Sequence, residues 1–180
     1  MGQIMSLQYN KNIILNVLEQ QSGLGKTAVM KIIYMLQQVK KMDMGYDFTI
    51  YAYGPYSAGV IEDIDDLIEK SLVDSQVYEY ANYIGYNLNL TALGKTKLAK
   101  LVTNDERKIK DILSFAGEKQ AKELELFSTI IFIENQYAKN QWEREQKDIV
   151  DKVAEIKPHF NKEKISTAYT TLLENKYIKS

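Results

Sequence analysis

The chain has 180 residues, of which 45% are hydrophobic and 26% are charged, and its 23 basic side chains nearly balance its 24 acidic ones. This composition is typical of a folded globular protein and excludes intrinsic disorder and collagen-like repeats. The net charge of −1 provides no overall field that would attract nucleic acid or an anionic membrane. The chain has no cysteine and one histidine, His159, which excludes disulfides, thiolate catalysis and multi-histidine metal sites.

The first hundred residues alternate between helical and strand-like patterns. Apolar residues at spacings of three and four predict helices over about residues 7–20, 27–41 and 57–70, the first ended by Ser22-Gly23 and the third capped by Ser57. The β-branched and aromatic run at residues 47–53 predicts a strand that Gly54-Pro55 ends. Residues 76–80 and 83–90 predict a hairpin around Ala81-Asn82.

From Thr91 onward every segment has a helical pattern. Thr91 is expected to cap a helix that continues to Val102, Gly117 to end the next one, and Pro158 to end the fourth before a last helix starts near Asn161. The sequence therefore predicts a mainly α fold with a small β-sheet (α+β). We expect an N-terminal domain at residues 1–103 and an all-helical C-terminal region at residues 104–180.

The order helix, helix, strand, helix and hairpin is that of a winged helix, although residues 43–56 make a longer connection than usual between its second and third helices. The end of the third helix, residues 67–73, is matched by residues 172–178 at the end of the last helix. Two interpretations of this match stay open: a helix-turn-helix-like pair at the C-terminus, or two unrelated helices that end alike.

Several short segments carry a family resemblance. They are Lys26-Thr27, Lys31-Ile32-Ile33-Tyr34, the run from Phe48 to Tyr53, Gly54-Pro55-Tyr56-Ser57, and the helix from Leu67 to Val73. In these segments the chain resembles the YwgA-like and Panacea (SocA-like antitoxin) winged-helix proteins, most clearly over residues 27–73. The resemblance implies a winged-helix-like fold without catalytic residues and a role in regulation or toxin neutralisation through binding.

One segment, Gly23-Leu24-Gly25-Lys26-Thr27, has part of a phosphate-loop pattern. The pattern requires a glycine where Gln20 stands and a strand where a helix is expected, so we reject it. The sequence also offers no nucleophile–base pair and no cluster of metal ligands. We therefore expect a protein that is not an enzyme, with no catalytic residue, no metal and no cofactor.

Acidic residues crowd the third helix, which would be the recognition helix of a winged helix. Glu62, Asp65, Asp66 and Glu69 recur at three- and four-residue spacings and are expected to form a solvated face opposite Ile61, Ile64 and Ile68. Residues 51–90 as a whole carry a net charge of −6. Because like charges repel phosphates, only the first turn of this helix is suited to reading a duplex.

Basic residues gather instead over residues 91–122, where the net charge is +4. This stretch is the better candidate for phosphate contact, and the alternative is an ordinary solvated helical face. The residues that we consider candidates for DNA contact are Tyr56, Ser57, Lys95, Lys97, Lys100, Arg107 and Lys108.

Eight of the thirteen tyrosines fall between Tyr46 and Tyr86. Tyrosines on strands commonly pack a sheet against helices, but tyrosine is also enriched at binding hot spots. A surface of tyrosines and acids would suit a basic protein partner. The candidates for protein contact are Tyr51, Tyr53, Tyr56, Glu62, Asp65, Asp66 and Glu69.

The sequence leads to one function class with two candidate partners. The chain is expected to be a non-enzymatic winged-helix regulatory module in the cytoplasm, without attachment to a membrane. It would act either as a DNA-binding transcriptional regulator or as an antitoxin- or adaptor-type module that binds a basic protein. Its amphipathic C-terminal helices are typical of a homodimer interface.

Overall fold

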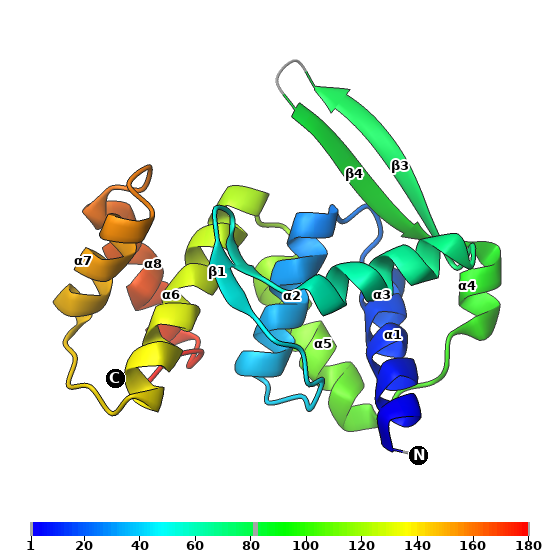
Figure 1. Cartoon of the computed structure of the whole chain (residues 1–180), viewed down its shortest axis with the longest axis horizontal. Coiled ribbons are helices and arrows are strands. Elements are labelled where there is room, and N and C mark those ends of the chain that lie inside the picture. Colours follow the sequence, from blue (N-terminus) through cyan, green and yellow to red (C-terminus); the bar gives the residue numbers. More distant parts are fainter. Residues whose placement is uncertain (1, 81–82, 180) are drawn as a thin grey trace. The chain divides into compact units, whose positions relative to one another are not determined.

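The computed structural model describes residues 2–80 and 83–179 and confirms the α+β class, with mainly helical structure and two small antiparallel sheets (Figure 1). The elements are α1 (Gly2–Gln20), α2 (Lys26–Gln38), β1 (Thr49–Tyr51), β2 (Gly54–Tyr56), α3 (Ala58–Glu69), β3 (Val73–Tyr80), β4 (Tyr83–Leu90), α4 (Ala92–Lys97), α5 (Thr103–Ala116), α6 (Ala121–Lys139), α7 (Gln146–Ile156) and α8 (Lys162–Glu174).

The chain folds into two compact units that do not follow the division expected near residue 103. The first unit comprises Met1–Phe48 and Ser57–Gln120, and the second comprises Thr49–Tyr56 and Ala121–Ser180. Helix α5 belongs to the first unit because it packs against α1 and α2. The short hairpin β1–β2 leaves the first unit because β2 packs against α6.

The core of the first unit is formed by the apolar stripes that the sequence predicts. Ile14 of α1, Ile33 of α2 and Ile64 of α3 are all buried, and Ile109 and Ile112 of α5 close the same core. Burial of each such side chain contributes roughly 1.5–3 kcal/mol of hydrophobic free energy. Helix α3 is thus fixed between α1 and α2 through its apolar face.

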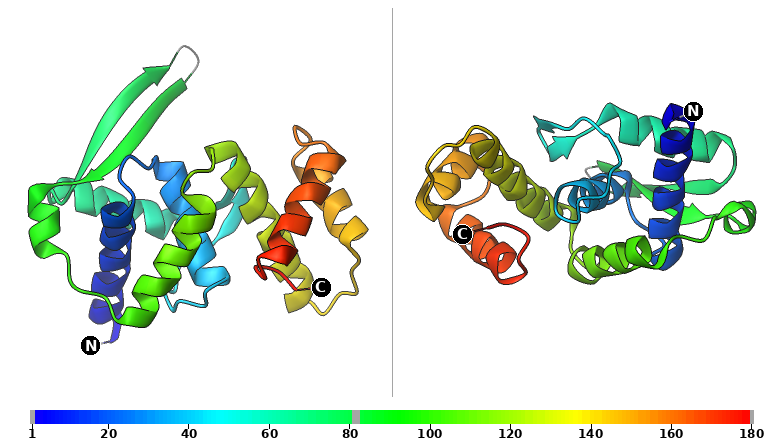
Figure 2. Two further views of the ribbon diagram at one scale, coloured as in Figure 1. Left: turned by 180° about the vertical axis from the view of Figure 1, so that it is seen from behind. Right: turned by 90° about the horizontal axis from the view of Figure 1, so that it is seen from below.

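The two strands β3 and β4 form a hairpin that projects away from the helices of the first unit (Figures 1 and 2). The strands were expected, but β3 begins at Val73 and not at residue 76, since Val73 pairs with Leu90. The base of the hairpin is tied to the core by Leu88, whose N–H donates to Leu24 O at 2.8 Å. The expected turn, Ala81-Asn82, lies outside the described residues.

The strand expected at residues 47–53 is only three residues long, Thr49–Tyr51, and it forms a hairpin with a second three-residue strand, Gly54–Tyr56. Gly54-Pro55 was expected to end the strand, but β2 pairs back on β1 with Ile50 opposite Pro55. Gly54 permits this turn because its φ of +89° is a conformation that other residues rarely adopt. The buried ammonium of Lys157 holds the turn by donating to the carbonyls of Tyr51, at 2.8 Å, and Ala52, and it pairs with the buried Glu125 at 3.1 Å.

The second unit is built on three mutually packed helices, α6, α7 and α8. Helix α8 starts near Asn161 as expected, and Asn161 caps it because its side chain accepts a hydrogen bond from the N–H of Lys164 at 2.8 Å. The buried carboxylate of Glu134 on α6 accepts from Tyr169 on α8 at 2.8 Å and from Arg144 at 2.6 Å. These polar contacts link α6 to α8 and to the loop before α7.

The helix expected over residues 91–102 is much shorter. Thr91 caps it as predicted by accepting from the N–H of Gly94 at 2.9 Å, but α4 ends at Lys97. The side chain of Asn12 then accepts from the N–H of Ala99 at 3.0 Å and donates to its carbonyl at 3.1 Å. These long-range bonds replace helical hydrogen bonds and hold the chain outside a helix over residues 98–102.

The matching ends of α3 and α8 have the same geometry. Ser71 and Lys176 both adopt positive φ, at 57° and 59°, and the next residues, Leu72 and Tyr177, donate to carbonyls five residues back at 2.9 Å. This is a Schellman-type helix ending. The N–H of Trp142 makes the same type of bond after α6, so the seven-residue match reflects a common way of ending a helix.

Candidate functional site

The acids of α3 divide into a buried set and an exposed set. Asp63 is buried and Asp66 is half-buried, whereas Glu62, Asp65 and Glu69 are exposed. Asp66 was expected to share a solvated face with Glu62, Asp65 and Glu69. This expectation is wrong for Asp66, which is half-buried. Asp63, which is three residues after Val60 and four before Leu67, lies on the apolar stripe, and that spacing is a sequence signal for its burial.

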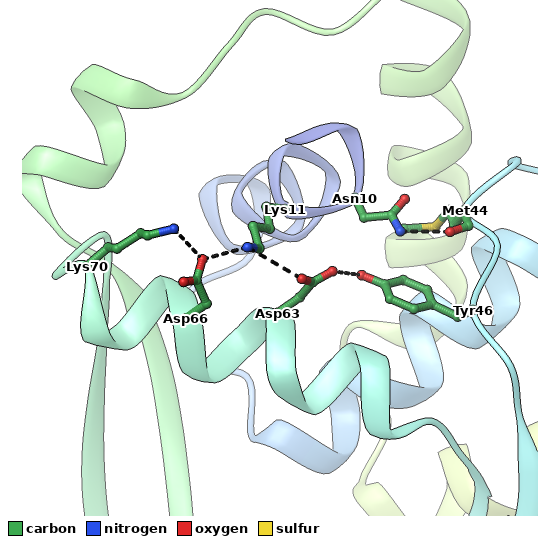
Figure 3. Close-up of polar contacts among 7 residues, drawn as sticks. All are labelled: Asn10, Lys11, Met44, Tyr46, Asp63, Asp66 and Lys70. Carbon is green, nitrogen blue, oxygen red and sulfur yellow. Dashed lines mark hydrogen bonds and ion pairs between the residues drawn. The ribbon is translucent and has the colours of Figure 1, made fainter. Parts of the chain in front are cut away.

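Asp66 is half-buried because two lysines enclose its carboxylate (Figure 3). Its Oδ2 lies 2.6 Å from Lys11 Nζ of α1 and 2.8 Å from Lys70 Nζ at the end of α3. Hydrogen bonds from Lys11 and then Lys70 lower the pKa of Asp66, and the same bond to Asp66 raises the pKa of Lys11. Asp66 is therefore committed to an internal ion pair network and is a poor candidate for contact with a partner.

Asp63 continues the same network into the core. Its Oδ1 lies 3.7 Å from Lys11 Nζ, and its Oδ2 accepts a hydrogen bond from the hydroxyl of Tyr46 at 2.5 Å (Figure 3). Burial, followed by the hydrogen bond to Asp63, raises the pKa of Tyr46. This arrangement locks α3 to α1 and to the segment after α2, so its role is structural. Sequence reasoning did not identify Lys11 or Tyr46, since their spacing carries no signal.

An acidic ridge remains on the outer side of α3. We define the acidic ridge as Glu62, Asp65 and Glu69, which recur at spacings of three and four and therefore share one face of the helix. Lys26 of α2 pairs with Asp65 at 2.7 Å at one side of this ridge. A ridge of this charge repels a phosphate backbone and attracts a basic surface.

The β3–β4 hairpin follows α3 in the chain, and its outer half exposes an apolar face. Val77 pairs with Tyr86 across the strands and Glu79 pairs with Ile84, and all four of these residues are exposed. The other face is polar around Tyr78, whose hydroxyl donates to Gln76 at 2.9 Å. Residues 73–90 contain no lysine or arginine, so this hairpin offers no cation to a phosphate.

The predicted surface of tyrosines and acids is divided between the two compact units. Tyr51, Tyr53 and Tyr56 belong to the second unit, while the acidic ridge belongs to the first. All three tyrosines are exposed, and the rings of Tyr51 and Tyr56 lie 5.2 Å apart between centroids. The tyrosines and the acids of the predicted surface therefore belong to different compact units.

The candidates for DNA contact also differ in their surroundings. Ser57 is only 3% exposed, and its N–H donates to Met30 Sδ at 3.4 Å, so the prediction that it contacts DNA is wrong. Its side chain also does not cap α3, contrary to expectation. Lys108 is half-buried and pairs with Asp105 at 4.0 Å. Lys95, which lies 3.8 Å from Glu19, is exposed, as are three others: Lys97, Lys100 and Arg107.

Residues 2–80 and 83–179 offer neither a metal cluster nor a membrane-spanning helix. No group of three or more histidine, cysteine, aspartate or glutamate side chains among them could hold a metal ion. None of the helices in the described part of the chain is both long enough and apolar enough to span a bilayer.

No protein-family model and no curated protein matches this chain.

Proposed function

We propose that this chain is a non-enzymatic winged-helix regulatory module that binds another protein through α3 and the β3–β4 hairpin. The order α1, α2, α3, β3, β4 supports the winged-helix interpretation, together with the packing of α3 against α1, α2 and β3. In that interpretation α3 occupies the place of the recognition helix and β3–β4 the place of the wing.

The observation that carries the proposal is the charge of these two elements. Residues 58–90 hold seven acids and one base, and the exposed members include the acidic ridge. The base, Lys70, is paired with Asp66. A partner with a basic surface would meet favourable electrostatics, which speeds encounter and disfavours wrong partners. The exposed apolar face at Val77, Ile84 and Tyr86 would supply the buried contact that a stable interface needs.

The test is site-specific crosslinking in cells that make the protein. A photo-crosslinking amino acid at Glu62 is expected to give an adduct with one defined protein, whereas the same group at exposed Glu143 of the second unit is not. Binding of the purified partner should weaken about tenfold in Glu62→Lys/Glu69→Lys, since charge pairs across an interface contribute 1.5 kcal/mol or more. The matched control, Glu106→Lys/Glu118→Lys, reverses two exposed acids of the first unit elsewhere and should bind normally.

DNA binding is the second candidate because Lys95, Lys97, Lys100 and Arg107 are exposed within the first unit. Fluorescence anisotropy with a mixed-sequence duplex over a series of salt concentrations distinguishes the two. Tight binding that weakens steeply with salt, and that is lost in Lys95→Gln/Lys97→Gln/Lys100→Gln, would establish the DNA-binding alternative. Absence of an adduct at Glu62 would reject the protein-binding proposal.

A further inference from the structure

A cavity of about 460 Å³ opens at the C-terminal end of α3, within the first unit. Its apolar wall consists of four leucines from three parts of the chain: Leu15 of α1, Leu67 and Leu72 around the end of α3, and Leu93 of α4. Leu93 is 46% exposed, so part of this apolar wall faces solvent. The volume lies within the range of roughly 300–1,000 Å³ that is usual for small-molecule sites.

The polar part of the cavity carries an excess of positive charge. Lys11, Lys70 and Lys97 line it together with a single acid, Asp66. Lys11 and Lys70 share Oδ2 of Asp66, and Asp63 lies behind Lys11 at 3.7 Å. Lys97 forms no ion pair within the described residues. Three ammonium groups therefore face two carboxylates, which leaves one positive charge uncompensated.

The cavity walls are held in place by bonds over long sequence distances. The hydroxyl of Thr91, at the start of α4, donates to Ser71 O at 2.7 Å, and its N–H donates to Leu72 O at 3.1 Å. Gly94 lies so close to the turn between α3 and β3 that an added Cβ would be 2.1 Å from Leu72 O. Asn12 of α1 binds the backbone of Ala99 on the opposite side. A site with fixed walls loses little free energy to ordering when a ligand binds.

We propose that this cavity binds a small organic monoanion with an apolar body. The carboxylate of such a ligand would accept hydrogen bonds from Lys97 and Lys70 and neutralise the uncompensated charge. Its apolar body would cover Leu93 and the neighbouring leucines. The site is distinct from the acidic ridge and its occupancy does not depend on the identity of a protein partner.

The test uses the full chain and three probes that share a naphthalene body, are similar in size and differ in charge. The probe is naphthalene-1-carboxylate, and its controls are the neutral 1-naphthylmethanol and the cationic 1-naphthylmethylammonium. Titration followed by ¹H–¹⁵N NMR should shift the amide signals of Leu72, Leu93 and Ala99 with the carboxylate. The neutral probe should bind about tenfold more weakly, the loss expected for one charge-assisted hydrogen bond, and the cation should not bind.

Two variants on α4 test whether the ammonium of Lys97 in the cavity binds the carboxylate. Lys97→Gln should weaken binding of the carboxylate about tenfold. Lys95→Gln removes an exposed lysine two residues away, outside the cavity, and should leave binding unchanged. Shifts confined to other regions, equal binding of the neutral probe, equal effects of the two variants, or binding of inorganic phosphate as tight as that of the carboxylate would each overturn the proposal.

Discussion

Lys11 Nζ of α1 lies 2.6 Å from Asp66 Oδ2 of α3, so one ion pair connects the first helix of the chain to the helix that carries the acidic ridge. The same ammonium lies 3.7 Å from Asp63, and the same carboxylate oxygen lies 2.8 Å from Lys70 Nζ. These ion pairs add to the apolar packing that fixes α3 within the first unit, while the side chains of the acidic ridge face outward.

Replacement of Asp66 is expected to change how stability depends on pH. The folded state lowers the pKa of Asp66 below its ordinary 3.8, so the stabilisation it provides is present above that pKa and is lost as the pH falls through the lower folded value. Asp66→Asn should cost about 1 kcal/mol at pH 6, because half-exposed ion pairs are screened by solvent. Urea unfolding should show this difference at pH 6, its decline as the pH falls below 3.8, and its disappearance once the pH is below the folded pKa of Asp66. A difference that persists at the lower pH would exclude the ion pair as its source.

The buried pair of Lys157 and Glu125 gives a larger effect in the second unit. Lys157→Met should destabilise the protein by roughly 3–5 kcal/mol, because it leaves the Glu125 carboxylate without its buried partner and removes the donor for the carbonyls of Tyr51 and Ala52. The double variant Lys157→Met/Glu125→Leu should recover part of this loss. Denaturant unfolding of Lys157→Met, Glu125→Leu and the double variant measures the coupling free energy between the two side chains. Losses of stability that simply add would contradict this coupling.

Gly94 is expected to tolerate no side chain. In Gly94→Ala the new Cβ would meet Leu72 O at 2.1 Å, a backbone atom that cannot rotate away. We expect a loss of about 3 kcal/mol, the upper end of the usual range for overpacking. Thr96→Ala, at an exposed position of the same helix, is the control and should change stability by less than about 0.5 kcal/mol. Equal thermal stability of the two variants would show that α4 is not tightly docked.

Tyr169 should affect stability mainly at alkaline pH. Burial, followed by the hydrogen bond to Glu134, raises the pKa of Tyr169 to about 12. Its stabilisation is complete below the unfolded pKa of 10.0 and is lost as the pH rises through the folded value. Tyr169→Phe should cost about 1 kcal/mol at pH 7 and should flatten the decline between pH 10 and 12. Unfolding curves of Tyr53→Phe, which alters an exposed tyrosine, should match those of the unaltered protein.

Local patterns in the sequence predicted most of the secondary structure. The apolar stripes of α1, α2 and α3, the cap at Thr91, the start of α8 near Asn161, and the two strands of the long hairpin follow from the period of side chains and from hydrogen bonds within a few residues. The acidity of α3 and the absence of a cation from residues 73–90 are also properties of the sequence alone. These features account for the expectation of a basic protein partner.

Tertiary packing decided which charged residues are exposed at the surface and where some of the helices end. Asp66 is enclosed by Lys11, which is 55 positions earlier in the chain, and α4 is cut short because Asn12 binds the backbone of Ala99. Lys157 fixes the turn at Tyr51 across a separation of 106 residues. Such partners leave no periodic signal, because the fold brings them together only after distant helices have packed. The sequence determined most of the helices and their charge, and the packing determined which acids of α3 are exposed and where the cavity forms.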